Sequence, residues 1–218
     1  MHHDPQEIDR LLKVLTIHVS QFFRNPSTFS KLTTDIFPYL MFKSENEGRP
    51  VLDIWSVGCS SGEEPYTLAI LMLDTFSEEL EKTAVSIQAT DIDERILAIA
   101  REAAYEPERL KDVPPLLRER YFETCNGRFR PVRQVREMVR FRQCDLLHEN
   151  SFIVSDLILC RNVLIYLERV EQERILHQFA DALRPGGVLV LGKSETLVGN
   201  ARSLFKTVCP VERIYKKI

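Results

Sequence analysis

The feature that most constrains this fold is a regular alternation of short apolar runs with segments of helical periodicity, beginning near residue 51. The runs that we predict as strands are Val51–Val57, Val85–Thr90, Met138–Gln143, Ser155–Cys160 and Val188–Leu191. The segments that we predict as helices are Glu63–Phe76, Glu94–Glu102, Arg161–Leu167 and Gln172–Leu183. Strands that alternate with helices favour an α/β fold, in which a doubly wound, mostly parallel sheet carries helices on both faces.

The two ends of the chain follow other patterns. Apolar residues at near-helical spacing in Ile8–Phe22 predict an opening amphipathic helix, and Asn25-Pro26 ends it because a residue before proline avoids the α region. Thr28–Phe42 predicts a second helix. At the other end, Phe205–Val208 and Arg213–Lys216 predict an antiparallel hairpin on the sheet edge.

These patterns suggest a division of the chain. We expect an N-terminal helical segment at residues 1–30 and a main domain at residues 31–218, with a small basic β-subdomain inserted at about 119–142. We also expect Pro185-Gly186-Gly187 to break the chain before the last parallel strand.

Basic residues are concentrated in one segment. The chain has a formal net charge of −3, yet Arg109–Arg142 contains ten Arg and Lys residues against four Asp and Glu residues. A basic segment in an acidic chain indicates an acidic partner, either a nucleic acid or a carboxylate-rich protein. A solvated surface gives the same pattern, and charge alone does not choose between the two.

Composition also argues against several classes of protein. Five cysteines without a CxxC pair and five histidines without HExxH give no basis for a disulfide framework or a metal site. This cysteine usage favours a reducing, cytoplasmic location. No apolar run approaches the ~20 residues that span a bilayer, so we expect no direct membrane insertion.

The expected binding site lies where the parallel strands end, because ligands of such sheets bind beyond the carboxyl ends of the strands. The segments that follow the predicted strands are Gly58–Glu64, Asp91–Asp93, Cys144–Leu146, Arg161–Asn162 and Gly192–Glu195. We expect them to surround one crevice.

The first strand-to-helix turn, Gly58–Glu64, disfavours a phosphate ligand. It contains neither GxGxxG nor GK[ST], and Glu63 and Glu64 occupy the first turn of the helix, where free N–H groups attract anions. Two carboxylates there would repel a phosphate, and they favour a ligand with a cationic part. In a purely structural alternative, Ser61 caps the helix and Glu64 completes a capping box.

Acidic residues after the next strands favour a nucleoside. Asp91 follows the second strand, where an acid accepts hydrogen bonds from ribose hydroxyls, although Asp91 or Asp93 could instead cap the following helix. Asp145, after the third strand, could accept from an adenine amino group. The crevice therefore favours a nucleoside ligand that lacks phosphate and carries positive charge, and S-adenosyl-L-methionine has both properties.

Four sequence blocks resemble the signature of the CheR family, the protein-glutamate O-methyltransferases of bacterial chemotaxis. They are IWSVGCSSGEEPYTLAILM, ATDIDERILAIAREAAY, LILCRNVLIYLE and LRPGGVLVLGKSETL, in that order. Thr16–Asn25 is similar to the family's opening motif. The resemblance covers nearly all of residues 16–218. It implies a class I, Rossmann-like methyltransferase fold that uses S-adenosyl-L-methionine and releases S-adenosyl-L-homocysteine.

The same resemblance implies the acceptor and the site residues. The acceptor would be glutamate side chains of a chemotaxis-receptor-like protein, with the cytoplasmic helical domain of a methyl-accepting receptor as partner. The implied cofactor-binding residues are His18, Ser20, Arg24, Glu64, Asp91, Asp145, Leu146, Arg161 and Asn162. Arg24 and Tyr166 would be catalytic, flanking the transferred methyl group and holding the acceptor carboxylate. The segment at about 119–142 is similar to a subdomain that docks a receptor's tail peptide in some members.

The sequence departs from the family pattern in three places. His18 stands where the family has asparagine, and Lys193 stands where it has histidine. The family's N-terminal helical domain, which helps to hold the substrate, is reduced here to about one helix.

The implied chemistry requires no general base, because a glutamate with a pKa near ~4.3 is already ionised at neutral pH. The site must instead align oxygen, methyl carbon and sulfur. The planar guanidinium of Arg24 suits a carboxylate, and Tyr166 offers a directional hydrogen bond. Two structural alternatives compete with these roles: Arg24 as a helix-end charge and Tyr166 as a core aromatic.

Two other functions stay open. The same fold could methylate another acceptor, such as RNA or a small molecule, or the chain could be a non-catalytic regulatory module that binds S-adenosyl-L-methionine. Phe129 and Phe141 are isolated among the arginines and do not form a base-stacking pattern, so we expect no nucleic acid partner. The sequence does not indicate an oligomeric state.

Overall fold

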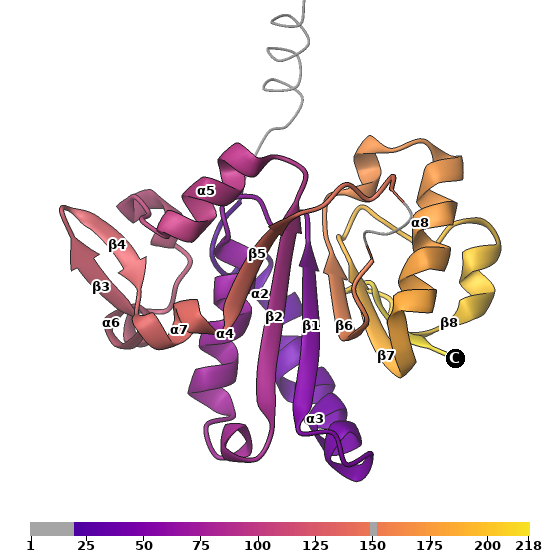
Figure 1. The fold of residues 1–218 in the computed structure, drawn as a ribbon, viewed down its shortest axis with the longest axis horizontal. Helices are drawn as coiled ribbons and strands as arrows, with labels where there is room; N and C mark the ends of the chain where they lie inside the picture. Colours follow the sequence, from indigo (N-terminus) through magenta and orange to yellow (C-terminus); the bar gives the residue numbers. More distant parts are fainter. Residues whose placement is uncertain (1–19, 149–151) are drawn as a thin grey trace, which may run out of the picture.

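A computed structural model describes residues 20–148 and 152–218, within which seven strands form one sheet in the order β5-β2-β1-β6-β7-β9-β8 (Figure 1). The strands are β1 (Val51–Val57), β2 (Ala84–Asp91), β5 (Val139–Gln143), β6 (Ser155–Cys160), β7 (Leu183–Leu191), β8 (Phe205–Cys209) and β9 (Ile214–Lys217). From β5 to β7 neighbouring strands are parallel, whereas β9 is antiparallel to β7 and β8. The predicted doubly wound sheet with an antiparallel edge hairpin is confirmed.

Helices cover both faces of this sheet. The α-helices of the described residues are α2 (Pro26–Lys31), α3 (Phe37–Asn46), α4 (Glu63–Thr75), α5 (Glu94–Glu102), α6 (Pro115–Tyr121), α7 (Arg133–Glu137) and α8 (Arg169–Ala182). The shorter turns are η1 (Leu32–Ile36), η2 (Glu79–Glu81), η3 (Pro107–Leu110), η5 (Leu164–Tyr166) and η6 (Gly199–Leu204). No helix among residues 20–148 and 152–218 is long and apolar enough to cross a membrane.

Two cores lie between these layers. Leu52 and Ile54 of β1 belong to the core shared with α3, α4 and α5, whereas Trp55 and Val57 belong to the core shared with α8. Successive side chains of a strand point to opposite faces of its sheet, so one apolar strand supplies both cores. This explains why the central strands appear in the sequence as unbroken apolar runs.

The predicted helix Thr28–Phe42 is divided into three parts. α2 ends at Lys31, the π-helical turn η1 follows, and α3 begins at Phe37. The N–H of Phe37 donates to the carbonyl of Leu32, five residues back, and the next residue, Pro38, has no N–H to donate. The predicted division between residues 30 and 31 falls inside α2. The predicted opening helix from Ile8 lies outside the described residues, except for its last positions.

Two predictions around the later strands are wrong. Arg161–Leu167 is not a continuous helix: only the 3₁₀ turn η5 forms, and Asn162 has a left-handed backbone with φ of 61°. Pro185-Gly186-Gly187 does not precede the strand but lies inside β7, where the register against β6 shifts between Ser155 and Leu157. An irregularity of this kind accommodates proline within a strand.

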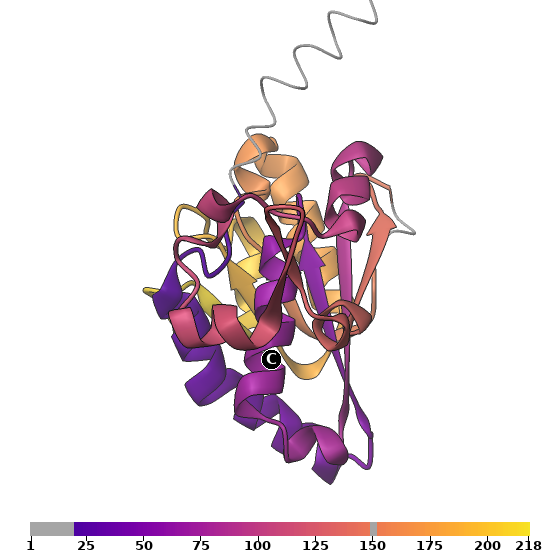
Figure 2. The same cartoon turned by 90° about the vertical axis from the view of Figure 1, so that its left-hand side faces the viewer.

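The insertion expected at about 119–142 contains a single hairpin. Strands β3 (Phe122–Cys125) and β4 (Arg128–Pro131) form a separate two-stranded sheet, flanked by α6 and α7. The hairpin lies at the far left of Figure 1, and Figure 2 looks onto that end of the molecule. Residues 139–143 belong instead to the main sheet as β5, paired with β2. The basic insertion is therefore continuous with the strand that ends at the predicted crevice.

Candidate functional site

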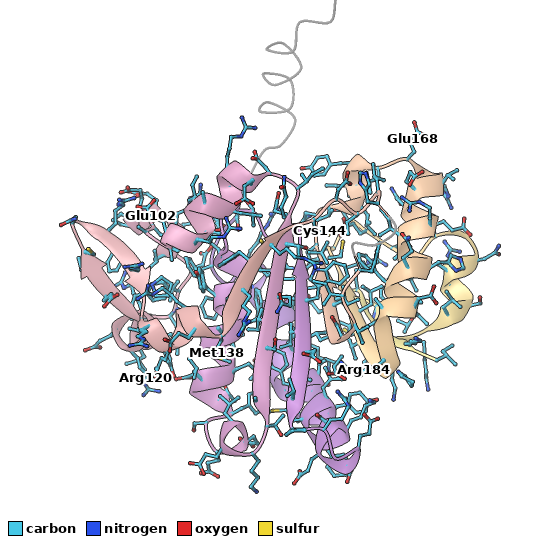
Figure 3. The ribbon with its side chains drawn as sticks, in the orientation of Figure 1. Glu102, Arg120, Met138, Cys144, Glu168 and Arg184 are labelled. Atoms are coloured by element: carbon cyan, nitrogen blue, oxygen red, sulfur yellow. The ribbon has the colours of Figure 1, made fainter. Side chains whose placement is uncertain are left out.

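A cavity of about 670 Å³ lies where the parallel strands end. Its volume is within the ~300–1,000 Å³ of typical small-molecule sites. Eight of the predicted cofactor residues line it: Ser20, Arg24, Glu64, Asp91, Asp145, Leu146, Arg161 and Asn162. Tyr166 and Cys144 line it as well, and Figure 3 labels Cys144 just beyond β5. His18 lies outside the described residues. The structure thus brings the described predicted residues together in one cavity.

Asp91 and Asp93 have different roles at the end of β2. Asp93 is the N-cap of α5 and accepts from the N–H of Arg95 at 2.9 Å. Asp91, only 8% exposed, accepts from the N–H of Ser60 at 2.9 Å and from the N–H of Asp93 at 3.1 Å. Each oxygen of Asp91 keeps a second lone pair. Asp93 therefore caps α5, and Asp91 can accept hydrogen bonds from a ligand.

The capping box suggested for α4 does not form. The N-cap is Gly62, in a left-handed conformation with φ of 94°, and no side chain caps the helix. Ser61 Oγ donates instead to Glu63 Oε2 at 2.7 Å. Glu64 Oε1 accepts from Ser56 Oγ at 2.8 Å. Capping thus does not account for Glu64, which lines the cavity.

Arg161 joins two walls of the cavity. Its Nη1 donates to Glu64 Oε2 at 3.0 Å, and its Nη2 donates to the Arg24 carbonyl at 2.9 Å and to Asn25 Oδ1 at 2.6 Å. Arg161 is 8% exposed, so these partners compensate a nearly buried charge. It lines the cavity as predicted, and it also fixes the backbone that carries Arg24.

Further contacts hold the N-terminal wall, residues 20–25. Arg109 Nη1 donates to the Ser20 carbonyl at 2.6 Å and lies 3.5 Å from Oε1 of the fully buried Glu63. The N–H of Phe23 donates to Thr67 Oγ1 at 3.1 Å. Two residues of α4 and one after α5 therefore position the chain segment that supplies Ser20 and Arg24 to the cavity.

The position of Tyr166 depends on the backbone of its turn more than on side-chain packing. It is 62% exposed, so it is not the core aromatic of the structural alternative. Its N–H donates to the Val163 carbonyl at 3.2 Å within η5. Val163 in turn approaches Gly58, where a Cβ would overlap the Val163 side chain. The glycine after β1 thus lets the turn before Tyr166 pack against the first strand-to-helix turn.

One residue of this site was not singled out from the sequence. Glu195 is 4% exposed, and its carboxylate accepts backbone N–H groups from Gly192 and from residues 162–165. The sequence placed Gly192–Glu195 around the crevice, but none of these four residues lines the cavity, and the sequence gave no signal for the role of Glu195. The Ser-Glu pair within the LGKSETL block is the one feature that could have drawn attention to it.

Cysteine chemistry has little support here. Burial raises the pKa of the Cys59 and Cys160 thiols well above the usual range, and nearby carboxylates add to the shift. A thiol with a raised pKa is a poor nucleophile at neutral pH. Within residues 20–148 and 152–218, no group of His, Cys, Asp and Glu side chains is arranged to hold a metal ion.

Ion pairs, both within the basic insertion and with α4 and α5, neutralise part of its charge. Its ion pairs are Arg120 with Asp74 at 2.6 Å, Arg128 with Glu102 at 3.1 Å, Arg133 with Glu137 at 2.6 Å, and Arg136 with Glu123 at 3.8 Å. Figure 3 labels Glu102 and Arg120 on this side of the molecule. These exposed pairs contribute little stability, but they account for four of the seven basic side chains at residues 119–142.

Comparison with known proteins identifies the family. The profile described as "CheR methyltransferase, SAM binding domain" matches residues 18–212. A chemotaxis protein methyltransferase of Listeria innocua is 36% identical over 89% of this chain and 71% of its own length. An uncharacterized 104.1 kDa protein of Rhodobacter capsulatus is 34% identical over 90% of this chain, which spans 20% of that protein. A SAM-dependent methyltransferase structure from Methanosarcina mazei covers 67% of this chain and 54% of its own, at 20% identity and a TM-score of 0.41. With its cavity and its signature residues in one place, the chain belongs to the CheR family of S-adenosylmethionine-dependent methyltransferases.

Proposed function

We propose that this protein methylates glutamate side chains of a chemotaxis-receptor-like protein in the cytoplasm. The observation that carries the proposal is the convergence of Arg24 and Tyr166 on the cavity that contains Asp91 and Glu64. The first pair offers groups for a carboxylate acceptor, and the second pair offers carboxylates for a cationic nucleoside. Relatives that are named chemotaxis protein methyltransferases support the same acceptor class.

The cavity fits S-adenosyl-L-methionine by the chemistry of its lining. Asp91 keeps acceptor capacity for the ribose hydroxyls, and Asp145 lines the same cavity after β5. The N-terminus of α4, where a phosphate would bind, carries Glu63 and Glu64 in its first turn. When bound, this cofactor supplies a methyl group on a positively charged sulfur.

The residues of the chain then orient the acceptor. One oxygen of an ionised glutamate forms a bond to the methyl carbon as the carbon–sulfur bond breaks, leaving its electron pair on sulfur. The products are a methyl ester and S-adenosyl-L-homocysteine, and no proton is transferred. Arg24 would hold the acceptor carboxylate, and the exposed hydroxyl of Tyr166 would direct the attacking oxygen. Alignment of this kind can supply up to ~7–11 kcal/mol of the barrier reduction.

The test is transfer of labelled methyl groups to purified cytoplasmic domains of methyl-accepting chemotaxis receptors. A glutamate methyl ester releases labelled methanol in alkali, whereas an N-methyl group or a methylated base keeps its label. The control is the same receptor domain with its candidate glutamates replaced by glutamine. Alkali-labile label that disappears in the control supports the proposal, and alkali-stable label or label on RNA contradicts it. Binding of S-adenosyl-L-homocysteine without any transfer would instead support a regulatory module.

A further inference from the structure

A single buried carboxylate gathers the backbone N–H groups of two loops beside the cavity. Glu195 Oε2 accepts from Gly192 at 2.6 Å and from Asn162 at 2.9 Å. Its Oε1 accepts from Val163 at 2.9 Å, from Leu164 at 2.8 Å and, more weakly, from Ile165 at 3.4 Å. Among the described residues, no cation forms an ion pair with Glu195. A buried charge is costly without compensation, and here the N–H groups supply it.

The chain after β6 does not form the predicted helix because Asn162 leaves the right-handed α region, and the N–H groups of Tyr166 and Leu167 donate three residues back, to Val163 and Leu164. Glu195 accepts the N–H groups of residues 162–165, most of which the first turn of a helix would leave without a partner. Asn162 adopts φ of 61°, in the left-handed region that asparagine enters more readily than most residues other than glycine. We call residues 162–167 the tyrosine turn.

The tyrosine turn is fixed from several directions. At Gly192 a Cβ would lie 2.7 Å from Glu195 Oε2 and 2.9 Å from the Asn162 nitrogen, so this position requires glycine. On the other side, Gln172 Nε2 on α8 donates to the carbonyls of Leu164 and Leu167, each at 3.0 Å. Glu195 therefore holds the N–H groups of the turn, and Gln172 holds its carbonyls.

The turn carries side chains into the site. Asn162, Val163, Ile165, Tyr166 and Leu167 all line the cavity. Because Tyr166 is mostly exposed, neighbouring side chains do little to set the place of its hydroxyl. The backbone of the turn must do so, and the strongest constraints on that backbone come from Glu195.

We propose that Glu195 is a positioning residue for methyl transfer, which sets the tyrosine turn and, through it, the hydroxyl of Tyr166. This inference rests on the proposed role of Tyr166 toward the acceptor carboxylate. Glu195 does not itself line the cavity, so its effect on turnover must pass through the turn.

The test compares Glu195→Gln with Tyr166→Phe and with the double variant. Glutamine preserves the shape but turns one acceptor oxygen into an NH₂ donor that faces backbone N–H donors. We expect kcat to fall by about 10–100-fold in Glu195→Gln, as small misplacements of reacting groups do. If Glu195 acts through Tyr166, the double variant should lose hardly more than the more severe single variant. Losses that multiply would overturn the inference.

The matched control is Glu173→Gln. Glu173 Oε1 also accepts a backbone N–H, from Asn200 at 2.7 Å, but Asn200 lies in η6 and not in the tyrosine turn. Its kcat should stay within about twofold of the parent. If Glu195→Gln does not fold, Gln172→Leu removes the hydrogen bonds from α8 to the carbonyls of the turn. Its combination with Tyr166→Phe then tests in the same way whether the turn acts through Tyr166.

Hydrogen exchange separates this inference from the proposed function. In Glu195→Gln the amides of residues 162–164 should exchange at least tenfold faster than in the parent, while those of β6 keep their protection. Unchanged exchange there would show that Glu195 does not hold the turn, whatever the acceptor is. If exchange is faster in Glu195→Gln but the parent protein methylates no receptor, Glu195 does hold the turn and the proposed function is contradicted.

Discussion

Replacing Asp91 with asparagine tests how the cavity holds its nucleoside. The Asp91 carboxylate is nearly buried and already accepts two backbone N–H groups, from Ser60 and Asp93. Its second lone pairs are the acceptors available to the two ribose hydroxyls. Asparagine keeps the shape but removes the charge and turns one oxygen into a donor, which would face an N–H group or a hydroxyl.

The expected loss follows from these contacts. A hydrogen bond to a charged group contributes ~1.5–3 kcal/mol, and the variant weakens two of them. The amide oxygen retains part of this interaction. We therefore expect Asp91→Asn to weaken the binding free energy by about 2–4 kcal/mol, which raises Kd roughly 30–1,000-fold. Calorimetric titration with S-adenosyl-L-homocysteine measures this loss directly, and thermal unfolding of each variant shows that it is folded.

Asp93→Ala provides the matched control, because Asp93 lies two residues away and caps α5 through the N–H of Arg95. Loss of an N-cap costs ~0.5–2 kcal/mol of stability, so the unfolding temperature should fall while affinity stays within about threefold. If Asp91→Asn binds within threefold of the parent, or if Asp93→Ala weakens binding as much, the assignment of Asp91 to the ribose is wrong.

Three further predictions follow from the same site. Arg24→Ala should abolish turnover while S-adenosyl-L-homocysteine affinity stays within about tenfold, and surviving turnover would contradict the role of Arg24. Gly58→Ala should lower the free energy of unfolding by about 1–3 kcal/mol, since the new Cβ overlaps Val163, and Gly48→Ala, with open space around it, serves as control in denaturant titrations. Burial raises the pKa of Cys59 and Cys160, so the folded state keeps protons that the unfolded state loses above about pH 8.5. Stability should therefore fall with rising pH above that value, by up to ~1.4 kcal/mol per unit for each thiol, and Cys160→Ala should reduce the slope.

The sequence predicts most of the framework, because local signals determine it. Val51–Val57 and Ser155–Cys160 are strands with the predicted bounds, and Glu94–Glu102 is a helix with the predicted bounds. Buried parallel strands are nearly all apolar, so their lengths can be read from composition alone. The crevice position follows from topology, and the family resemblance then selected the residues that line it.

The features that the sequence could not predict depend on partners far along the chain. Arg161 bonds to Glu64 and to the Arg24 carbonyl, which lie 97 and 137 positions earlier in the chain. Glu195 bonds to the tyrosine turn, about 30 positions earlier. Neither contact leaves a periodic signal. Residues 161–167, RNVLIYL, have the apolar character that predicts a helix, but the left-handed φ of Asn162 interrupts it and Glu195 holds the N–H groups that follow. The β7 irregularity at Pro185 likewise depends on its neighbour β6.

The acidic residues at the carboxyl end of the sheet divide into two sets by whether they line the cavity. Glu195 and Asp93 do not line it, and their carboxylates accept backbone N–H groups and so fix the loops. Asp91 and Glu64 line the cavity, and each also has a partner within the protein. Because Glu64 pairs with Arg161, which holds the backbone of Arg24, a cation bound near Glu64 would compete for the same carboxylate. Cofactor binding and the placement of Arg24 should therefore be energetically coupled, so that occupancy of the nucleoside site alters the side that receives the acceptor.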